Sequence, residues 1–161
     1  MIDLNKIQKG ALYHGVITLN SLTPFILAAD ATSTSVSMAS LGIGAAIPGG
    51  SVKYNFKLIL FVNETTTADS ISIDFNGGTA VAASFRAQPY CTDSAALQIA
   101  AQTTALATAI TPANFNGAGT IVVDAYISSA DGGTFIPRFA QKAHSTGTAT
   151  VFAGSRLVLS Q

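Results

Sequence analysis

The stretch "GTFIPRFAQ", residues 133–141, alternates like a β-strand yet carries a proline and an arginine. It has two distinct faces, with Phe135, Pro137 and Phe139 on one and Ile136 and Arg138 on the other. The first face is apolar, so we expect it to point into a core. Proline has no N–H to donate to a sheet ladder and is tolerated at an edge or a bulge, so we expect one of these at Pro137.

The chain as a whole is poor in charge. Only 10% of its 161 residues are charged, against roughly 25% in ordinary soluble domains, and the formal net charge is zero. Hydrophobic residues make up 48%, which at this length is enough for one domain with a real core. A neutral protein with few charges has little to repel its neighbours. The composition therefore favours a component of a larger assembly.

The sequence argues against nucleic-acid and membrane partners. The eight basic residues are scattered rather than clustered. No apolar run reaches the roughly 18 residues that span a bilayer. The most apolar stretch, residues 36–50, is short and is broken by glycine and proline. We expect a buried or packed loop there, with a membrane-active peptide as the alternative.

The ends and the cysteine content bear on where the chain is made. The first ten residues, "MIDLNKIQKG", lack the apolar segment of a secretory signal. Cys91 is the single cysteine, which excludes an internal disulfide framework. We therefore expect synthesis in a reducing cytosol without export by a signal peptide.

Hydrophobic residues recur with a period of two along most of the chain. In residues 53–63 the even-numbered positions from Tyr54 to Val62 share one face, while the other face begins polar and turns apolar at Ile59 and Phe61. That pattern predicts a strand partly covered on both sides. Further strands are expected in "SISIDF" (70–75), with an outward polar face, in "TIVVDAYIS" (120–128) and in "RLVLS" (156–160). Another is expected in "TAVAASFRA" (79–87), where Val81, Ala83 and Phe85 form the inward face.

Glycine-rich turns separate these strands, at residues 76–78, 116–119 and 131–133. Many short strands with such turns predict an all-β, antiparallel sandwich or barrel. We expect a single domain over residues 13–161. Residues 1–12 are expected to form an N-terminal arm, because no strand period is established there.

One segment fits two structures. Residues 94–110 place apolar side chains on a helical stripe, with Asp93 or Ser94 as a cap. The threonines and the strand-rich surroundings instead favour a strand over Thr103–Ile110. We expect the strand.

The sequence offers no catalytic constellation. His14 and His144 are far apart, and neither has a carboxylate or cysteine at ligand spacing. There is no G-x-S-x-G elbow and no phosphate-binding glycine loop. Cys91 lacks a local basic partner and is expected to be inert. We therefore expect a protein that is not an enzyme and has no cofactor, metal or small-molecule substrate.

The last third of the chain, residues 117–161, carries a succession of motifs. A strand and a glycine hairpin precede a "GT-apolar-x-apolar-x-F-A-Q" strand, and a polar loop leads to "T-apolar-x-x-G-S-x-L-x-apolar". The matching positions are Gly133, Thr134, Phe135, Phe139, Ala140, Gln141, Gly154, Ser155 and Leu157. This succession resembles the ending of many small bacteriophage structural proteins, and residues 54–62 resemble their long central strand. Pro137 and Arg138 depart from the pattern, which has an apolar and a small polar residue there.

The resemblance implies a jelly-roll β-sandwich similar to that of tumour necrosis factor and the complement globular head, which forms trimers. It implies a capsid decoration (cement) protein that binds the major capsid protein on the outer surface of the virion. The expected capsid contacts lie in the arm, at Ile2, Leu4, Lys6, Ile7 and Lys9. Ile136 and Arg138 are then the expected subunit contact, since an arginine can pair with a neighbour's carboxylate.

A second use of the same module is a tail-fibre or spike-associated adhesin. Sites that bind sugars or receptors favour exposed aromatic residues. The chain has no tryptophan and only four tyrosines, so the sequence favours the capsid role.

Overall fold

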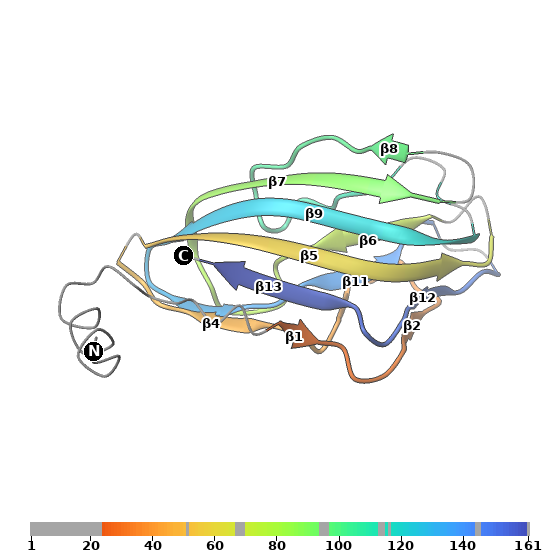
Figure 1. The fold of residues 1–161 in the computed structure, drawn as a ribbon, viewed down its shortest axis with the longest axis horizontal. Helices are drawn as coiled ribbons and strands as arrows, with labels where there is room; N and C mark the ends of the chain where they lie inside the picture. Colours follow the sequence, from red (N-terminus) through yellow and green to blue (C-terminus); the bar gives the residue numbers. More distant parts are fainter. Residues whose placement is uncertain are drawn as a thin grey trace, which may run out of the picture.

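The computed structural model describes residues 24–50, 52–66, 70–93, 97–112, 115, 117–143 and 146–160. Within these ranges every regular element is a β-strand, so the all-β prediction is confirmed. The strands form antiparallel sheets arranged in two layers, as in a sandwich (Figure 1). The predicted N-terminal arm lies outside the described residues. No described helix is long and apolar enough to cross a membrane.

The larger layer is a sheet in the order β1-β13-β5-β9-β7-β8, with β12 pairing β5 and β2 pairing β12. Its strands are β1 (Phe25–Ile26), β2 (Ala31–Ser33), β5 (Lys53–Glu64), β7 (Ala82–Thr92), β8 (Leu97–Ile99), β9 (Gly117–Ser129), β12 (Ala149–Val151) and β13 (Arg156–Ser160). The centre of the sheet is the long pair of β5 and β9, in register from Lys53↔Ser128 to Glu64↔Gly117.

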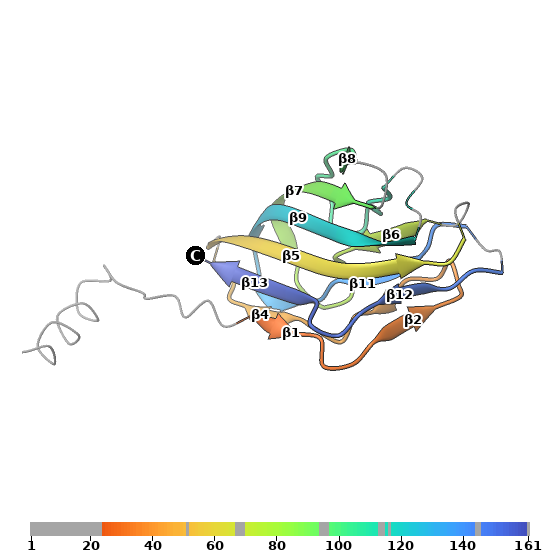
Figure 2. The same cartoon turned by 45° about the vertical axis from the view of Figure 1, so that its right-hand side comes forward.

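The smaller layer lies behind the larger one and consists of two short sheets (Figure 2). One pairs β10 with β4, and the other has the order β3-β11-β6. These strands are β3 (Ala39–Ser40), β4 (Ala45–Ile47), β6 (Ile71–Asp74), β10 (Gly133–Phe135) and β11 (Arg138–Gln141).

The core lies between the layers and is built from alternate residues of the strands. On β5, Phe56, Leu58, Leu60 and Val62 are buried, as the alternation predicts. Phe56 meets Phe135 of the smaller layer with ring centroids 4.6 Å apart, and Phe75 stacks on Phe135 at 5.4 Å. Aromatic pairs at such distances add to the area that they bury. The aromatic cluster therefore ties the two layers together.

Pro137 lies at a break in the ladder of the smaller layer. Its neighbour Arg138 is paired on both sides, with Ser40 of β3 and Asp74 of β6, so the strand is not an edge. Two residues, Ile136 and Pro137, lie opposite four, residues 41–44, which makes the ladder irregular there, as at a bulge. Phe135, Pro137 and Phe139 are buried, which confirms the inward face.

Three local predictions are wrong. The outward face of β6 is not wet, since Ser70, Ser72 and Asp74 are all buried and hydrogen-bonded within the fold. Val81 is exposed rather than inward, because a bulge between Ala82 and Ser84 changes the phase of the alternation before Phe85.

The third wrong prediction is the strand over Thr103–Ile110, which is neither strand nor helix. The segment crosses between the layers and is held at its two ends. Thr103 bridges to Ala87 of β7, and Ile110 bridges to Ile73 of β6. Between them the chain makes one turn, in which the N–H of Thr108 donates to the carbonyl of Ala105 at 3.2 Å.

The apolar stretch 36–50 packs onto the core, as expected, through β3, β4 and the residues between them. Leu41, Ile43, Ala45 and Ile47 are buried. Gly50, with φ of +85°, closes the turn that leads into β5. The stretch is apolar because its alternate residues point from the smaller layer into the core.

Candidate functional site

The two predicted contact residues share the outward face of the smaller layer. Ile136 and Arg138 are each half-buried there. Glycines beneath them leave room for both side chains. A Cβ at Gly44 would lie 2.7 Å from Cγ1 of Ile136, and one at Gly77 would lie 2.8 Å from Cγ of Arg138. Ile136 and the stem of Arg138 therefore lie flat over backbone.

Arg138 is engaged by a carboxylate of its own chain. Its Nε donates to Oδ1 of Asp74 at 2.8 Å, and its Nη2 donates to Oδ2 at 2.6 Å. This two-point geometry is the strongest form of an arginine–carboxylate pair. The hydrogen bond raises the pKa of Arg138 above its ordinary value. Arg138 therefore already has a partner within its own chain, whereas the sequence predicted that it pairs with a carboxylate of a neighbouring subunit.

Asp74 is the buried member of the pair. Its side chain is 3% exposed, against 27% for Arg138. A buried carboxylate is costly without a partner, so the arginine stabilises the position of β6 against β11. Sequence reasoning missed Asp74 because the two residues are 64 positions apart. The available signal was a lone acidic residue on the outward face of one strand and a lone basic residue on that of another.

A shallow groove opens beside Ile136. It measures about 240 Å³ and is lined by residues 40 and 42–46 together with Thr134 and Ile136. Its walls are mostly apolar side chains and glycine backbone, and Ser40 and Thr134 supply its only side-chain hydroxyls. It offers no titratable group for acid–base chemistry.

The polar groups at one end of the core form a second feature. Glu64 and Ser33 lie opposite Ala149 from its two sides and are buried with it. Gln141 is 1% exposed, and within the described part of the chain neither its amide oxygen nor its amide nitrogen has a hydrogen-bond partner. Buried groups of this kind cost stability, so Gln141 is a weak point of the core.

Most of the other residues singled out from the sequence cannot be placed in the described part of the chain. The five arm residues and the two histidines, His14 and His144, lie outside the described residues. Among the residues that are described, no three His, Cys, Asp or Glu side chains gather as metal ligands. Burial, with a smaller effect of Asp93, raises the pKa of the Cys91 thiol to about 12. Cys91 therefore stays protonated at neutral pH and behaves as a small apolar residue.

No protein-family model, curated protein or solved structure matches this chain.

Proposed function

We propose that the protein is a bacteriophage capsid decoration protein, a jelly-roll module that self-associates as a trimer on the outer shell and stabilises it. It acts by binding and performs no catalysis. Its partner is the major capsid protein, and its place is the outer surface of the virion after synthesis in the host cytoplasm.

The observation that carries the proposal is the structural use of the C-terminal motifs. Residues 117–160 supply β9 to β13, which include central strands of both layers. The motif positions Phe135, Phe139 and Leu157 are buried in the core. The glycines of the motifs adopt positive φ, +123° at Gly133 and +86° at Gly154. The residues that resemble phage structural proteins are thus those that this fold requires.

The "GS" of the final motif illustrates this use. Ser155 follows Gly154 and is fully buried. Its hydroxyl accepts a hydrogen bond from the backbone N–H of Phe61 at 3.0 Å, on the central strand β5. The motif thereby fastens the last strand to the centre of the sheet, and it supports the jelly-roll interpretation as a signature of fold rather than of chemistry.

A cement protein works by adding buried interface where capsomers meet. A standard interface of about 1,600 Å² is enough for stable association, and several linked subunits multiply the contact through avidity. In this proposal the arm supplies the contact through apolar Ile2, Leu4 and Ile7 and basic Lys6 and Lys9.

Co-sedimentation with capsids that lack the protein tests this role. The full chain should pellet with such capsids and raise the temperature at which they disrupt. A chain without residues 1–12 should keep its β-sheet circular dichroism but stay in the supernatant. If the full chain remains in the supernatant, the proposed function is wrong.

The adhesin alternative has one structural feature in its favour, which is a set of exposed aromatic residues. Phe25, Phe61, Tyr90 and Phe152 are 37–41% exposed. Binding of the isolated, labelled protein to host cells separates the two roles, since an adhesin binds cells and a cement protein binds capsids.

A further inference from the structure

The outward face of the larger sheet carries an apolar band that no described part of the chain covers. A row of paired residues crosses five strands in register, from β7 through β9, β5 and β13 to β1. The row is Tyr90–Val122–Ile59–Arg156–Ile26. Phe61 lies one outward position further along β5. We define the apolar band as Ile26, Ile59, Phe61, Tyr90 and Val122.

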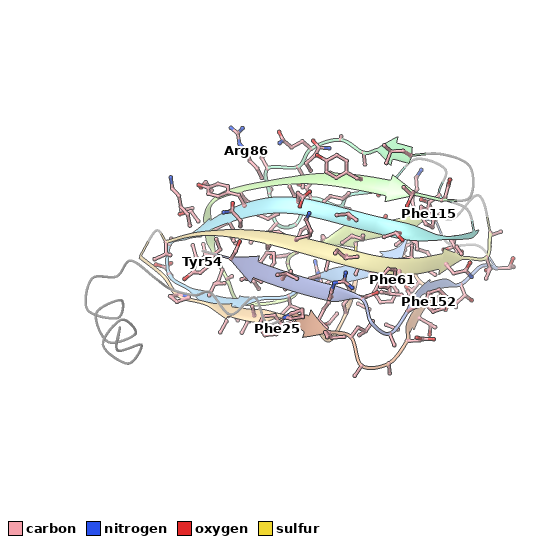
Figure 3. All side chains as sticks on the ribbon, viewed as in Figure 1. Phe25, Tyr54, Phe61, Arg86, Phe115 and Phe152 are labelled. Carbon is pink, nitrogen blue, oxygen red and sulfur yellow. The ribbon has the colours of Figure 1, made fainter. Side chains whose placement is uncertain are left out.

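The residues of the band face away from the core. On each of β5, β7 and β9, the neighbours of the band residue along the strand are buried. Ile26 is 56% exposed, and Phe61 and Tyr90 are each 37% exposed. Phe152 extends the band, since its N–H donates to the carbonyl of Phe61 at 2.8 Å, and its side chain is 37% exposed (Figure 3).

An antiparallel sheet with one wet face ordinarily alternates apolar and polar residues cleanly. The alternation of β5 fails in the band, where Ile59 and Phe61 stand at outward positions that Lys53, Asn55 and Lys57 keep polar elsewhere. The sequence thus predicts that both sides of this strand are partly covered. The described residues cover only the inward side, and exposed apolar patches of this kind mark interaction surfaces.

We propose that the apolar band is where two copies of this chain meet. This inference rests on the self-association in the proposed function and names its surface. It moves the subunit contact from the Ile136 and Arg138 face, where Arg138 is already paired with Asp74, to the larger sheet.

Charged side chains border the band rather than fill it. The formal charge within the row is Arg156, whose guanidinium lies 5.9 Å from the centre of the Phe61 ring. The next row carries Lys57 and Asp124, which pair with each other at 3.2 Å.

The size of the face also fits a second copy. The long strands β5, β7 and β9, at about 3.4 Å per residue, give a length of about 40 Å, and at about 4.8 Å per strand a width of about 14 Å. These three strands thus offer about 560 Å² (length times width), and β13 adds to it, so the face approaches the roughly 800 Å² that a standard interface buries on each partner.

Light scattering after size-exclusion chromatography tests the proposal on the full chain. The native protein should elute at a multiple of its 16.4 kDa mass. The double variant Ile59→Lys/Phe61→Lys should elute as a single chain, because it places two like charges at the centre of each contact. The matched control is Val36→Lys, which changes a 50% exposed residue outside the band and should leave the assembly intact.

Three outcomes contradict the inference: a native protein that is monomeric at all concentrations, a folded double variant that keeps the native mass, or a Val36→Lys variant that dissociates equally. Hydroxyl-radical footprinting of the native protein covers the case in which the double variant does not fold. Labelling of Phe61 and Tyr90 should be low in the assembly and rise several-fold on dilution to single chains. Unchanged labelling would contradict the inference.

The outcomes for the apolar band can be told apart from the outcomes for the capsid role. If the assembly depends on the band but the protein does not bind capsids, the band is retained and the capsid role is lost. If the protein binds capsids but the band variants still assemble, the capsid role is retained and the band is lost.

Discussion

Replacing Arg138 with methionine removes the guanidinium while keeping an apolar stem over Gly77. The variant leaves the carboxylate of Asp74 buried, at 3% exposure, without its two-point partner. Breaking a buried ion pair by removing one member costs about 3–5 kcal/mol. Because 27% of the Arg138 side chain is exposed and water screens the pair in part, we expect the lower end, about 3 kcal/mol.

Urea denaturation at fixed protein concentration measures this cost, since association would otherwise shift the midpoint. For a chain of this size, about 3 kcal/mol also corresponds to a fall in Tm of roughly 6–12 °C. Lys57→Met is the matched control. It breaks the Lys57–Asp124 pair, whose side chains are 51% and 49% exposed, and an exposed pair contributes at most about 1 kcal/mol.

The double variant Asp74→Leu/Arg138→Met completes the test. With both charges gone, no buried carboxylate is left alone, so the double variant should be more stable than Arg138→Met. If Arg138→Met costs no more than Lys57→Met, the pair does not hold β6 against β11 and the reasoning is refuted.

Three further predictions concern the core and its turns. Gly78→Ala should destabilise the fold by about 1–3 kcal/mol in urea, because its Cβ would clash with the carbonyl oxygen of Thr134; an unchanged midpoint would contradict this close approach. Gln141→Met should stabilise the fold by about 1 kcal/mol by removing a buried amide that has no partner among the described residues, and a loss of stability would show that the amide is satisfied. Cys91 has a folded pKa raised from 9.0 to about 12, so its unfolded thiol ionises first, and stability should fall between these pH values. A Cys91→Ala variant should lose that part of the fall in urea titrations at pH 8 and 11, and an identical pH dependence would refute the assignment.

Local alternation predicted the strands that carry the fold. In β5 the inward residues were identified correctly because a period of two follows from the backbone alone. The turn at residues 131–133 was likewise predictable from its two glycines. Glycine readily adopts positive φ, and both Gly132 and Gly133 do so in this turn.

The wrong predictions lie where distant parts of the chain decide the structure. Residues 103–110 have the composition of a strand, but their ends are fixed by bridges to Ala87 and Ile73 in different layers. The exposure of Val81 depends on a bulge that no local pattern reveals. In both cases pairing partners override propensity.

The candidate site was predictable only in part. The outward position of Arg138 follows from alternation, but its partner Asp74 follows from the pairing of β11 with β6. The apolar residues Ile59 and Phe61 were visible in the sequence as a second apolar face. Their alignment with Tyr90 and Val122 required the register of three strands.

The proposed role makes its most direct claim about the virion. Quantitative mass spectrometry of purified particles from the phage that encodes this chain measures how many copies each particle carries. The decoration role predicts copies in numbers comparable to the major capsid protein, released together with an increase in capsid fragility. Only a few copies per particle, or none, would contradict it.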